Sequence, residues 1–305
     1  MYSLALALGA LVATIAIIEF AFPATSARLA LSLERRRSGL RLKEKTVGDV
    51  TVRYLEGGQG DSLVLLHGFG ADKDNYTRVA GALTKHFHVI APDLPGFGDS
   101  TRLPDAPYPF VDQTHRLHEL LQGMGLTRYH IAGSSMGCAM AALYGALYPD
   151  HTMSRWLLAP AGVEGCDDSV MAAEYRATGK SLLLPSSVKD FERVMNLATE
   201  KPLWLPPSVK RLLGERAMAD SILHARVFEE IALSPPINDL MRDSTVPTLI
   251  VWGDKDRVLD VSGAEILRDA LPNATLIVMP GIGHLPMVEA PKQAAQDFIE
   301  FTTGL

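Results

Sequence analysis

Short apolar runs alternate with stretches of helical periodicity along most of the chain. The strand-like runs share apolar residues and boundaries at Gly, Pro or Asp, and they cover 50–55, 62–67, 88–93, 128–133, 155–160, 248–253 and 274–279. Several are apolar at every position, which is typical of strands buried on both faces of a mostly parallel sheet. With helices between them, these strands predict an α/β fold.

One region interrupts this alternation. Residues 163–243 contain no convincing strand, several amphipathic helical patterns and repeated proline breaks. We therefore predict a helical cap, or lid, inserted between a first core segment, 48–162, and a second core segment, 244–305.

The first 27 residues have a different character. Their only charged side chain is Glu19. Because about 20 apolar residues suffice to cross a bilayer core, we predict a transmembrane anchor helix in residues 1–27. A cleaved signal peptide is one alternative, but such peptides begin with positive charge, which is missing here. A helix buried in the protein is the other alternative.

Residues 28–47 predict a basic juxtamembrane segment. Residues 28–45 contain seven Lys and Arg residues and two Glu residues. Such a cluster attracts anionic lipid headgroups, and the interleaved leucines suit a helix at the interface; a solvated linker is the alternative. The positive-inside rule favours the cytoplasmic side for this segment, but one short segment leaves the membrane face of the domain open.

A stripe of small residues lies within the predicted anchor. Ala5, Gly9 and Ala13 recur every four residues, a spacing that lets two helices approach closely in lipid. The stripe suggests a homodimer formed through this helix.

Composition excludes several classes of protein. The chain has 305 residues, of which 47% are hydrophobic and 21% charged, so it is neither disordered nor fibrous. Two cysteines exclude a disulfide scaffold, and their separation fits no zinc finger. The net charge of −6 argues against a nucleic-acid partner.

The most informative motif is Gly133-Ser-Ser135-Met-Gly137. It follows the run at 128–133 and precedes an Ala-rich helical stretch, which is the strand-turn-helix setting of a serine nucleophile. The flanking glycines suit a strained turn with no room for side chains. Ser135 is therefore the candidate nucleophile.

A serine nucleophile needs a base, and the base needs an acid. His284 lies in a loop directly after the run at 274–279, at the edge of the sheet where α/β sites form. Asp254 and Asp256 both follow the run at 248–253. The chain order Ser, Asp, His is the one expected for this fold.

Three other histidines have structural interpretations. His67 precedes Gly68 and Gly70 at a strand end and suits a role in loop structure. His115 and His118 could share a helix face, but no carboxylate motif accompanies them as a metal site would require.

The sequence resembles the α/β-hydrolase superfamily from about residue 48 to its end. The matching strings are HGFGADKDNY (67–76), PDLPGFGDS (92–100), GSSMG (133–137), WGDKDRV (252–258) and PGIGHLPMVEAP (280–291). The resemblance implies Asp256 as the acid, since in the family that residue stands three positions after the glycine that closes the strand. It also implies an oxyanion hole formed by the N–H groups of Phe69 and Met136.

Within the superfamily, the layout is similar to membrane-anchored bacterial acyl hydrolases: phospholipase A and lipase proteins, with monoacylglycerol lipases as more distant relatives. The anchor, the basic segment and the HGFGADKDN string fit that group. Cys138 departs from it, since such enzymes often have Gly there. Ser135 excludes the aspartate-nucleophile branches. The resemblance implies no metal and no cofactor.

These observations lead to one main functional hypothesis. We expect a single-pass protein, anchored in a bacterial inner membrane, that releases fatty acids from glycerolipids or phospholipids. Apolar cap residues would hold the acyl chain, because each buried CH₂ contributes about 0.8 kcal/mol; the candidates are Leu183, Leu203 and Trp204. Alternatives are a carboxylesterase or carbon–carbon bond hydrolase for small soluble substrates, and a non-enzymatic ligand receptor.

Overall fold

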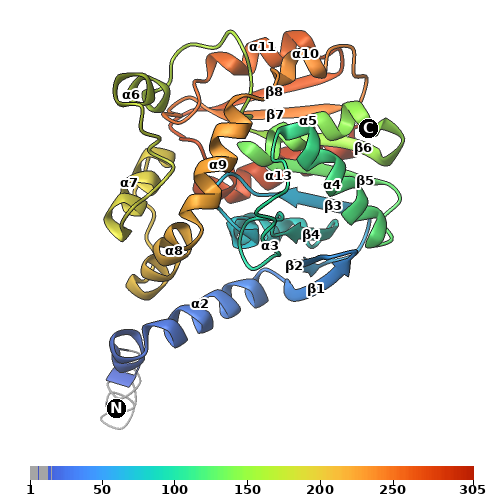
Figure 1. Cartoon of the computed structure of the whole chain (residues 1–305). Coiled ribbons are helices and arrows are strands. Elements are labelled where there is room, and N and C mark those ends of the chain that lie inside the picture. Colours follow the sequence, from blue (N-terminus) through green and yellow to red (C-terminus); the bar gives the residue numbers. More distant parts are fainter. Residues whose placement is uncertain (1–5, 7–12, 15) are drawn as a thin grey trace.

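A computed structural model describes residue 6, residues 13 and 14, and residues 16–305. Its centre is one sheet in the order β1-β2-β4-β3-β5-β6-β7-β8 (Figure 1). The strands are β1 (Arg41–Val47), β2 (Val50–Gly57), β3 (Ser62–Leu66), β4 (His88–Pro92), β5 (Tyr129–Ser134), β6 (Thr152–Leu158), β7 (Thr248–Gly253) and β8 (Ala274–Met279). The first two are antiparallel to their neighbours, and the strands from β4 to β8 run parallel. The predicted mostly parallel sheet is therefore confirmed.

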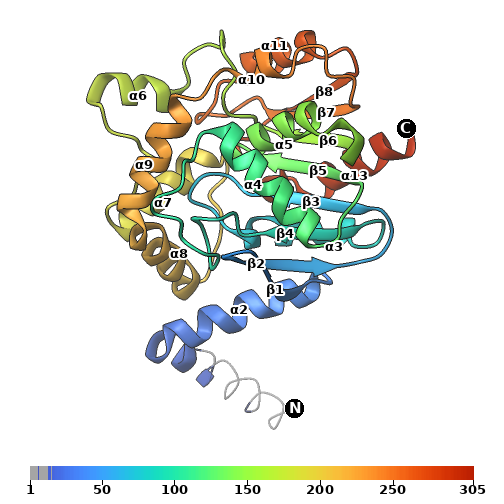
Figure 2. The same ribbon diagram turned by 45° about the vertical axis from the view of Figure 1, so that its right-hand side comes forward.

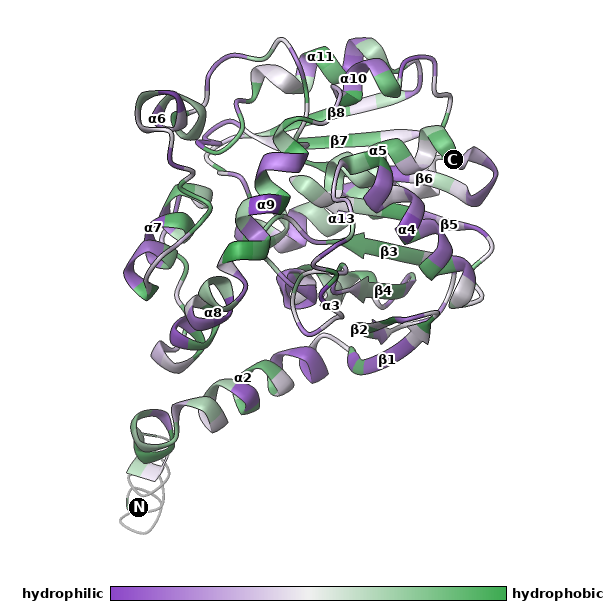
Figure 3. Ribbon diagram, in the orientation of Figure 1, coloured by the Kyte–Doolittle hydropathy of each residue, from purple (hydrophilic) through white to green (hydrophobic). Residues whose placement is uncertain are grey.

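The seven predicted strands correspond to β2–β8, whereas β1 was not predicted. Its side chains are exposed at every position except the last, and Figure 3 shows it as largely hydrophilic beside the apolar central strands. A charged edge strand of this kind protects a sheet from pairing with other chains. Residues 28–47, expected as one juxtamembrane segment, thus divide between helix α2 (Pro23–Arg37) and β1, which belongs to the sheet.

Helices cover both faces of the sheet. One face packs against α4 (Phe110–Gly123), α5 (Met136–Leu147) and α11 (Ser262–Ala270). The other packs against α3 (Thr77–Leu83), α12 (Pro286–Glu289) and α13 (Pro291–Thr303). Along β3, Val64 and Leu66 enter the first core while Leu63 and Leu65 enter the second. Burial on both faces explains why the central strands have uninterrupted apolar sequences.

The stretch between β6 and β7 is helical, as the sequence pattern indicates. It contains α6 (Val170–Thr178), α7 (Val188–Ala198), α8 (Pro207–Ala219), α9 (Ser221–Ala232) and α10 (Ile237–Leu240). Figures 1 and 2 show α7, α8 and α9 beside the edge of the sheet where the parallel strands end. This is the edge at which ligands bind in open α/β sheets.

Helix α2 packs against the cap helix α8 (Figure 1). Ala27 and Leu31 are buried against Val209 and its apolar neighbours. Near its start, the Glu19 carboxylate accepts hydrogen bonds from the backbone N–H and the hydroxyl of Ser208, both at 2.8 Å. The contact joins the amino-terminal segment to the cap, a connection that the sequence did not indicate.

The described part of the chain contains no helix that is both long and apolar enough to span a bilayer. Most of the predicted anchor, including Ala5 and Gly9 of the small-residue stripe, lies outside the described residues. The homodimer expected from that stripe therefore stays a prediction.

Candidate active site

Ser135 lies on a sharp turn between β5 and α5. Its backbone has φ +53° and ψ −114°, a conformation that is strained for a residue with a side chain. A Cβ added to Gly133 would lie 2.2 Å from the carbonyl oxygen of Gly137, and one added to Gly137 would lie 2.3 Å from the carbonyl oxygen of Leu66. Neither flanking position could hold another residue, so the two glycines are required by close backbone contacts.

His284 and Asp256 lie on the loops that follow β8 and β7. His284 Nδ1 is 2.7 Å from Asp256 Oδ2, and both side chains are buried. The Asp256 carboxylate also accepts hydrogen bonds from the Trp252 indole at 3.0 Å and from the backbone N–H groups of Val258 and Leu259 at 2.8 and 3.0 Å. Four donors around one carboxylate hold it in a fixed orientation, and the carboxylate in turn fixes the histidine ring.

Asp254, the other candidate acid, is bonded to the loop backbone and not to His284 in the described structure. Its Oδ1 accepts a hydrogen bond from the backbone N–H of Gly281 at 2.6 Å, and its other oxygen is 3.6 Å from the Lys255 ammonium. It therefore caps the loop that leads to His284, and of the two candidate acids only Asp256 contacts that histidine in the described structure.

The loop of His284 is also bonded to the cap. The backbone N–H of His284 donates to the carbonyl of Ala198 at 2.8 Å. The Glu289 carboxylate accepts from the backbone N–H groups of Gly283 at 2.9 Å and Glu200 at 2.8 Å. These bonds tie the loop to the end of α7.

Phe69 and Met136 both lie close to Ser135. Met136 is the first residue of α5, and Phe69 lies in the loop after β3. A Cβ on Gly68 would lie 3.3 Å from the Ser135 Cβ, so this loop lies directly against the serine. Within the described residues, no acceptor is bonded to the backbone N–H of either Phe69 or Met136. Both amides are thus available to a ligand.

His67 is a structural residue, as its neighbouring glycines suggested. Its Nδ1–H donates to the Gly68 carbonyl at 2.8 Å, and its Nε2 accepts from the Leu94 N–H at 3.0 Å. Complete burial lowers its pKa to about 4, so the ring is neutral at pH 7. The neutral ring links the loop that carries Phe69 to the loop after β4.

Ion pairs stabilise the loop that follows β3, which carries Phe69. Lys73 is completely buried and donates to Asp93 at 2.7 Å and to Asp99 at 2.8 Å. Burial by itself lowers the pKa of Lys73, but the neighbouring Asp93 and Asp72 carboxylates raise it above the ordinary value. Arg216 of α8 reaches Asp72 at 3.0 Å. This ion-pair network was not predicted, although the charged DKD string after HGFGA was its visible signal.

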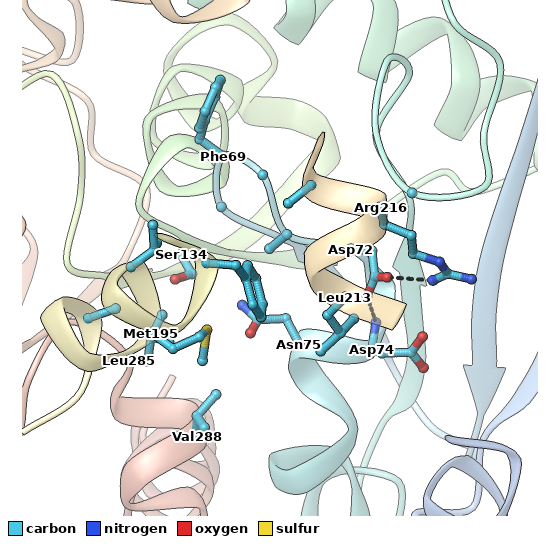
Figure 4. A pocket seen from close by; sticks show the side chains of 18 of the residues that line it. Phe69, Asp72, Asp74, Asn75, Ser134, Met195, Leu213, Arg216, Leu285 and Val288 are labelled. Atoms are coloured by element: carbon cyan, nitrogen blue, oxygen red, sulfur yellow. Dashed lines mark hydrogen bonds and ion pairs between the residues drawn. The ribbon is translucent and has the colours of Figure 1, made fainter. Parts of the chain in front are cut away.

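One pocket contains Ser135 and His284 together with Phe69. Figure 4 shows part of its lining, with Ser134, Met195, Leu285 and Val288 on one side and Asp72, Asp74 and Arg216 on the other. The cap supplies most of the apolar lining, including Leu183, Phe191, Val194, Met195, Leu203 and Leu205. Helix α2 adds Leu31 and Glu34. The pocket thus combines apolar walls with a charged margin.

Two of the three cap residues that were expected near the substrate line the pocket, and one does not. Leu183 and Leu203 line the pocket, whereas Trp204 does not and is 78% exposed. The expectation for Trp204 is corrected by this position. In the string LWLP the side chains of adjacent residues diverge, and the backbone of the folded loop decides which of them faces the pocket.

The remaining candidates lie away from the pocket. His115 and His118 form hydrogen bonds to the hydroxyls of Tyr148 at 2.6 Å and Tyr144 at 2.7 Å, and neither histidine is among the pocket-lining residues. Cys138 is buried in the core, where burial raises its pKa well above the ordinary value of a thiol.

Comparison with known proteins identifies the family. The family model described as alpha/beta hydrolase fold matches residues 61–291. The chain belongs to the α/β-hydrolase family. Lipase 3 from Moraxella sp. (strain TA144) is 37% identical over 285 residues, which cover 90% of this chain and 89% of the relative. Monoacylglycerol lipase ABHD6 from Rattus norvegicus is 29% identical, covering 81% and 77%.

A solved structure is similar over the whole chain. A crystal structure described as a membrane phospholipase A, a novel bacterial virulence factor, is 38% identical, with a TM-score of 0.90 and coverage of 100% of this chain and 99% of that one. Within the α/β-hydrolase family, these relatives identify the chain as an ester hydrolase of the lipase and phospholipase type.

Proposed function

We propose that this hydrolase releases fatty acids from glycerolipids, as a phospholipase A, lysophospholipase or lipase, through a Ser135–His284–Asp256 triad. One observation carries the proposal: Ser135 on its strained turn and His284, whose ring is fixed by Asp256 at 2.7 Å, line the same pocket. In α/β-hydrolases a serine on such a turn is the nucleophile.

The proposed reaction has two steps. The Ser135 hydroxyl attacks the ester carbonyl while His284 Nε2 accepts the hydroxyl proton, which it then gives to the departing alcohol oxygen. Water then attacks the acyl carbonyl while His284 takes its proton; the bond to Ser135 Oγ breaks, His284 returns the proton to that oxygen, and the fatty acid leaves. In each step the Phe69 and Met136 N–H groups would stabilise the negative charge on the carbonyl oxygen, and Asp256 would stabilise the imidazolium.

A lipid substrate is supported by the chemistry of the pocket. Its cap side is lined by apolar residues, including Leu183 and Leu203, which offer an acyl chain a favourable transfer from water. The relatives described as a lipase and as a membrane phospholipase A also favour a lipid substrate. Phospholipid therefore ranks above small soluble esters or carbon–carbon bond substrates as the proposed substrate.

We further propose that the protein acts at a membrane, anchored by residues 1–27 in a bacterial inner membrane. Exposed apolar side chains on the described part of the amino-terminal segment support this, namely Phe20, Phe22, Leu29 and Leu33. The arginines at the end of α2 add positive charge next to them, which suits an anionic lipid surface. A homodimer through the anchor helix belongs to the same proposal.

The test is product release from a total membrane lipid extract by detergent-solubilised full-length protein, with Ser135→Ala as control. Lysophospholipid and fatty acid formed only by the wild type would support a phospholipase A and identify the headgroup. Activity on short soluble esters without lipid turnover would support the carboxylesterase alternative instead. Replacing Gly9 with Ile and finding unchanged crosslinked dimers in membranes would remove the proposed dimer contact.

A further inference from the structure

The ring of Phe69 is surrounded by three other rings. Phe97, His224 and Phe228 each lie 5.8 Å from it between ring centroids, with interplanar angles of 76°, 63° and 70°. Edge-to-face packing of this kind is favourable for aromatic side chains. Two of the three rings belong to the cap helix α9, while Phe97 comes from the loop after β4.

His224 is held firmly within this cluster. Its ring stacks on Phe97 at 4.8 Å and 19°, and its Nε2–H donates to the Gly96 carbonyl at 3.2 Å. Burial lowers its pKa, which keeps the ring uncharged near neutral pH. This buried histidine has no role in the proposed mechanism, although it lines the same pocket as Phe69.

Helix α9 is itself fixed to the core at both ends. Before its first residue, Asp220 accepts from Arg102 at 2.5 Å. In its middle, Arg226 donates to the Ala106 carbonyl at 2.7 Å, and near its end Glu230 accepts from the Tyr108 backbone N–H at 2.6 Å. The two rings that α9 presents to Phe69 therefore have a fixed position relative to the sheet.

The backbone around Phe69 is held on its amino-terminal side by hydrogen bonds. The Phe69 N–H belongs to the same planar peptide as the Gly68 carbonyl, which accepts from His67 Nδ1–H at 2.8 Å and from the Ala71 N–H at 3.2 Å. On the other side lies Gly70, with φ +69°, a residue type with little conformational restriction. Packing of the Phe69 ring against the cap therefore adds a second support, through the side chain, to the direction of this N–H group.

From this arrangement we propose that His224 and Phe228 are positioning residues: they hold the Phe69 ring and thereby aim its N–H group at the carbonyl oxygen of the substrate. The proposal rests on the proposed function, since it assumes the oxyanion role of Phe69. It makes the cap a working part of the catalytic site, because movement of α9 would release Phe69 and weaken stabilisation of the oxyanion.

This role has a specific kinetic signature. An oxyanion donor acts mainly in the transition state, so loosening it lowers kcat and leaves KM unchanged. A residue that only lines the substrate pocket would instead raise KM. Removing one oxyanion donor completely costs about 100- to 1000-fold in kcat, so misaligning it should cost roughly 10- to 100-fold.

The experiment compares Phe228→Ala and His224→Ala with Ile222→Ala, an exposed position on the same helix. Substrate is a soluble butyrate ester, and a trifluoromethyl ketone serves as a transition-state analogue. We expect the first two variants to lose kcat roughly 10- to 100-fold and to bind the ketone more weakly by the same factor, with KM close to wild type; the thermal midpoint of each variant is measured to establish that it is folded at the assay temperature. Phe228→Tyr, which keeps the ring, should restore kcat, and Ile222→Ala should behave as wild type.

A raised KM with unchanged kcat and ketone affinity would overturn the proposal, because Phe228 and His224 would then be wall residues only. If Phe228→Ala does not fold, Phe228→Leu retains apolar volume without the ring and is judged by the same two readouts. Failure of the proposed function is separate: it would appear as ester hydrolysis that survives Ser135→Ala, whatever the cap variants do.

Discussion

The groups proposed to react and the walls that enclose them are held in place by different means. Ser135, Asp256 and His284 lie on turns at the ends of β5, β7 and β8, where close backbone contacts and backbone N–H donors fix their positions. The facing walls come from α2, α7 and α8. Helix α2 rests on α8 through side-chain contacts between segments far apart in the sequence, and the end of α7 is bonded to the loop of His284.

Helix α2 illustrates the second kind of support. Arg35 forms two hydrogen bonds to Asp74, at 2.6 and 2.5 Å, and Leu31 packs against Val209 of α8. The residues proposed to react thus lie at the sheet edge, whereas the shape of the pocket depends on side-chain contacts between segments that are distant in the sequence. Substitutions in the two regions should therefore have effects of different kinds and sizes.

The largest effect is expected at the serine. Ser135→Ala removes the nucleophile and should lower kcat by about 10⁴- to 10⁶-fold without loss of stability. Steady-state hydrolysis of a butyrate ester and a thermal denaturation curve measure the two quantities. Retention of more than a few per cent of wild-type activity would remove Ser135 from the mechanism.

The two aspartates at the sheet edge should differ in their effect on catalysis. Asp256→Asn should lower kcat by about 10⁴-fold, because the histidine loses the partner that fixes its tautomer. Asp254→Asn keeps an oxygen for the Gly281 N–H and should change kcat by less than about tenfold. The same ester assay on both variants measures the two losses in kcat. A larger loss for Asp254→Asn than for Asp256→Asn would show that Asp254 is the acid of the triad.

Lowering the pH should reduce the free energy of unfolding through His67. The folded-state pKa is about 4, below the ordinary value of 6.5, so the unfolded chain takes up a proton first as pH falls. Stability from this group is complete above pH 6.5 and declines towards pH 4, by about 3 kcal/mol in total. Urea unfolding at pH 7, 5.5 and 4.5 measures the change. The His67→Gln variant should show a shallower slope over this range; an identical slope would contradict the assignment.

The smallest effect is expected in the walls. Leu183→Ala should raise KM several-fold for long-chain esters and hardly change it for butyrate, since one to two CH₂ contacts at about 0.8 kcal/mol each are lost. Trp204→Ala is the matched control, because Trp204 lies outside the pocket. Plotting kcat/KM against acyl-chain length tests both. A chain-length profile altered by Trp204→Ala and unaltered by Leu183→Ala would show that the acyl chain binds elsewhere.

The sequence predicted the sheet edge well because its signals are local. Strands β2–β8 are apolar runs with clear boundaries, and the turn at Ser135 needs its two glycines. Residues alone left Asp254 and Asp256 open, and the family resemblance chose between them. The choice agrees with the observed contact between Asp256 and His284.

The walls were less predictable because their contacts are not local. The sequence of β1 is too polar to be recognised as a strand, and it forms a strand because it pairs with the edge of β2 (Val50–Gly57). The contacts of Leu31 with α8 and of Phe69 with α9 depend on how distant helices are placed. No spacing within one segment encodes such contacts, which explains why Trp204 was assigned to a pocket that it does not line.

Covalent labelling of the proposed nucleophile tests the Ser135–His284–Asp256 triad most directly. Wild-type protein and Ser135→Ala are treated with a fluorophosphonate probe, and the intact mass and the modified peptide are determined. We expect one adduct per chain on Ser135 in the wild type and none in the variant. Equal labelling of both proteins, or no labelling of the wild type, would contradict this expectation.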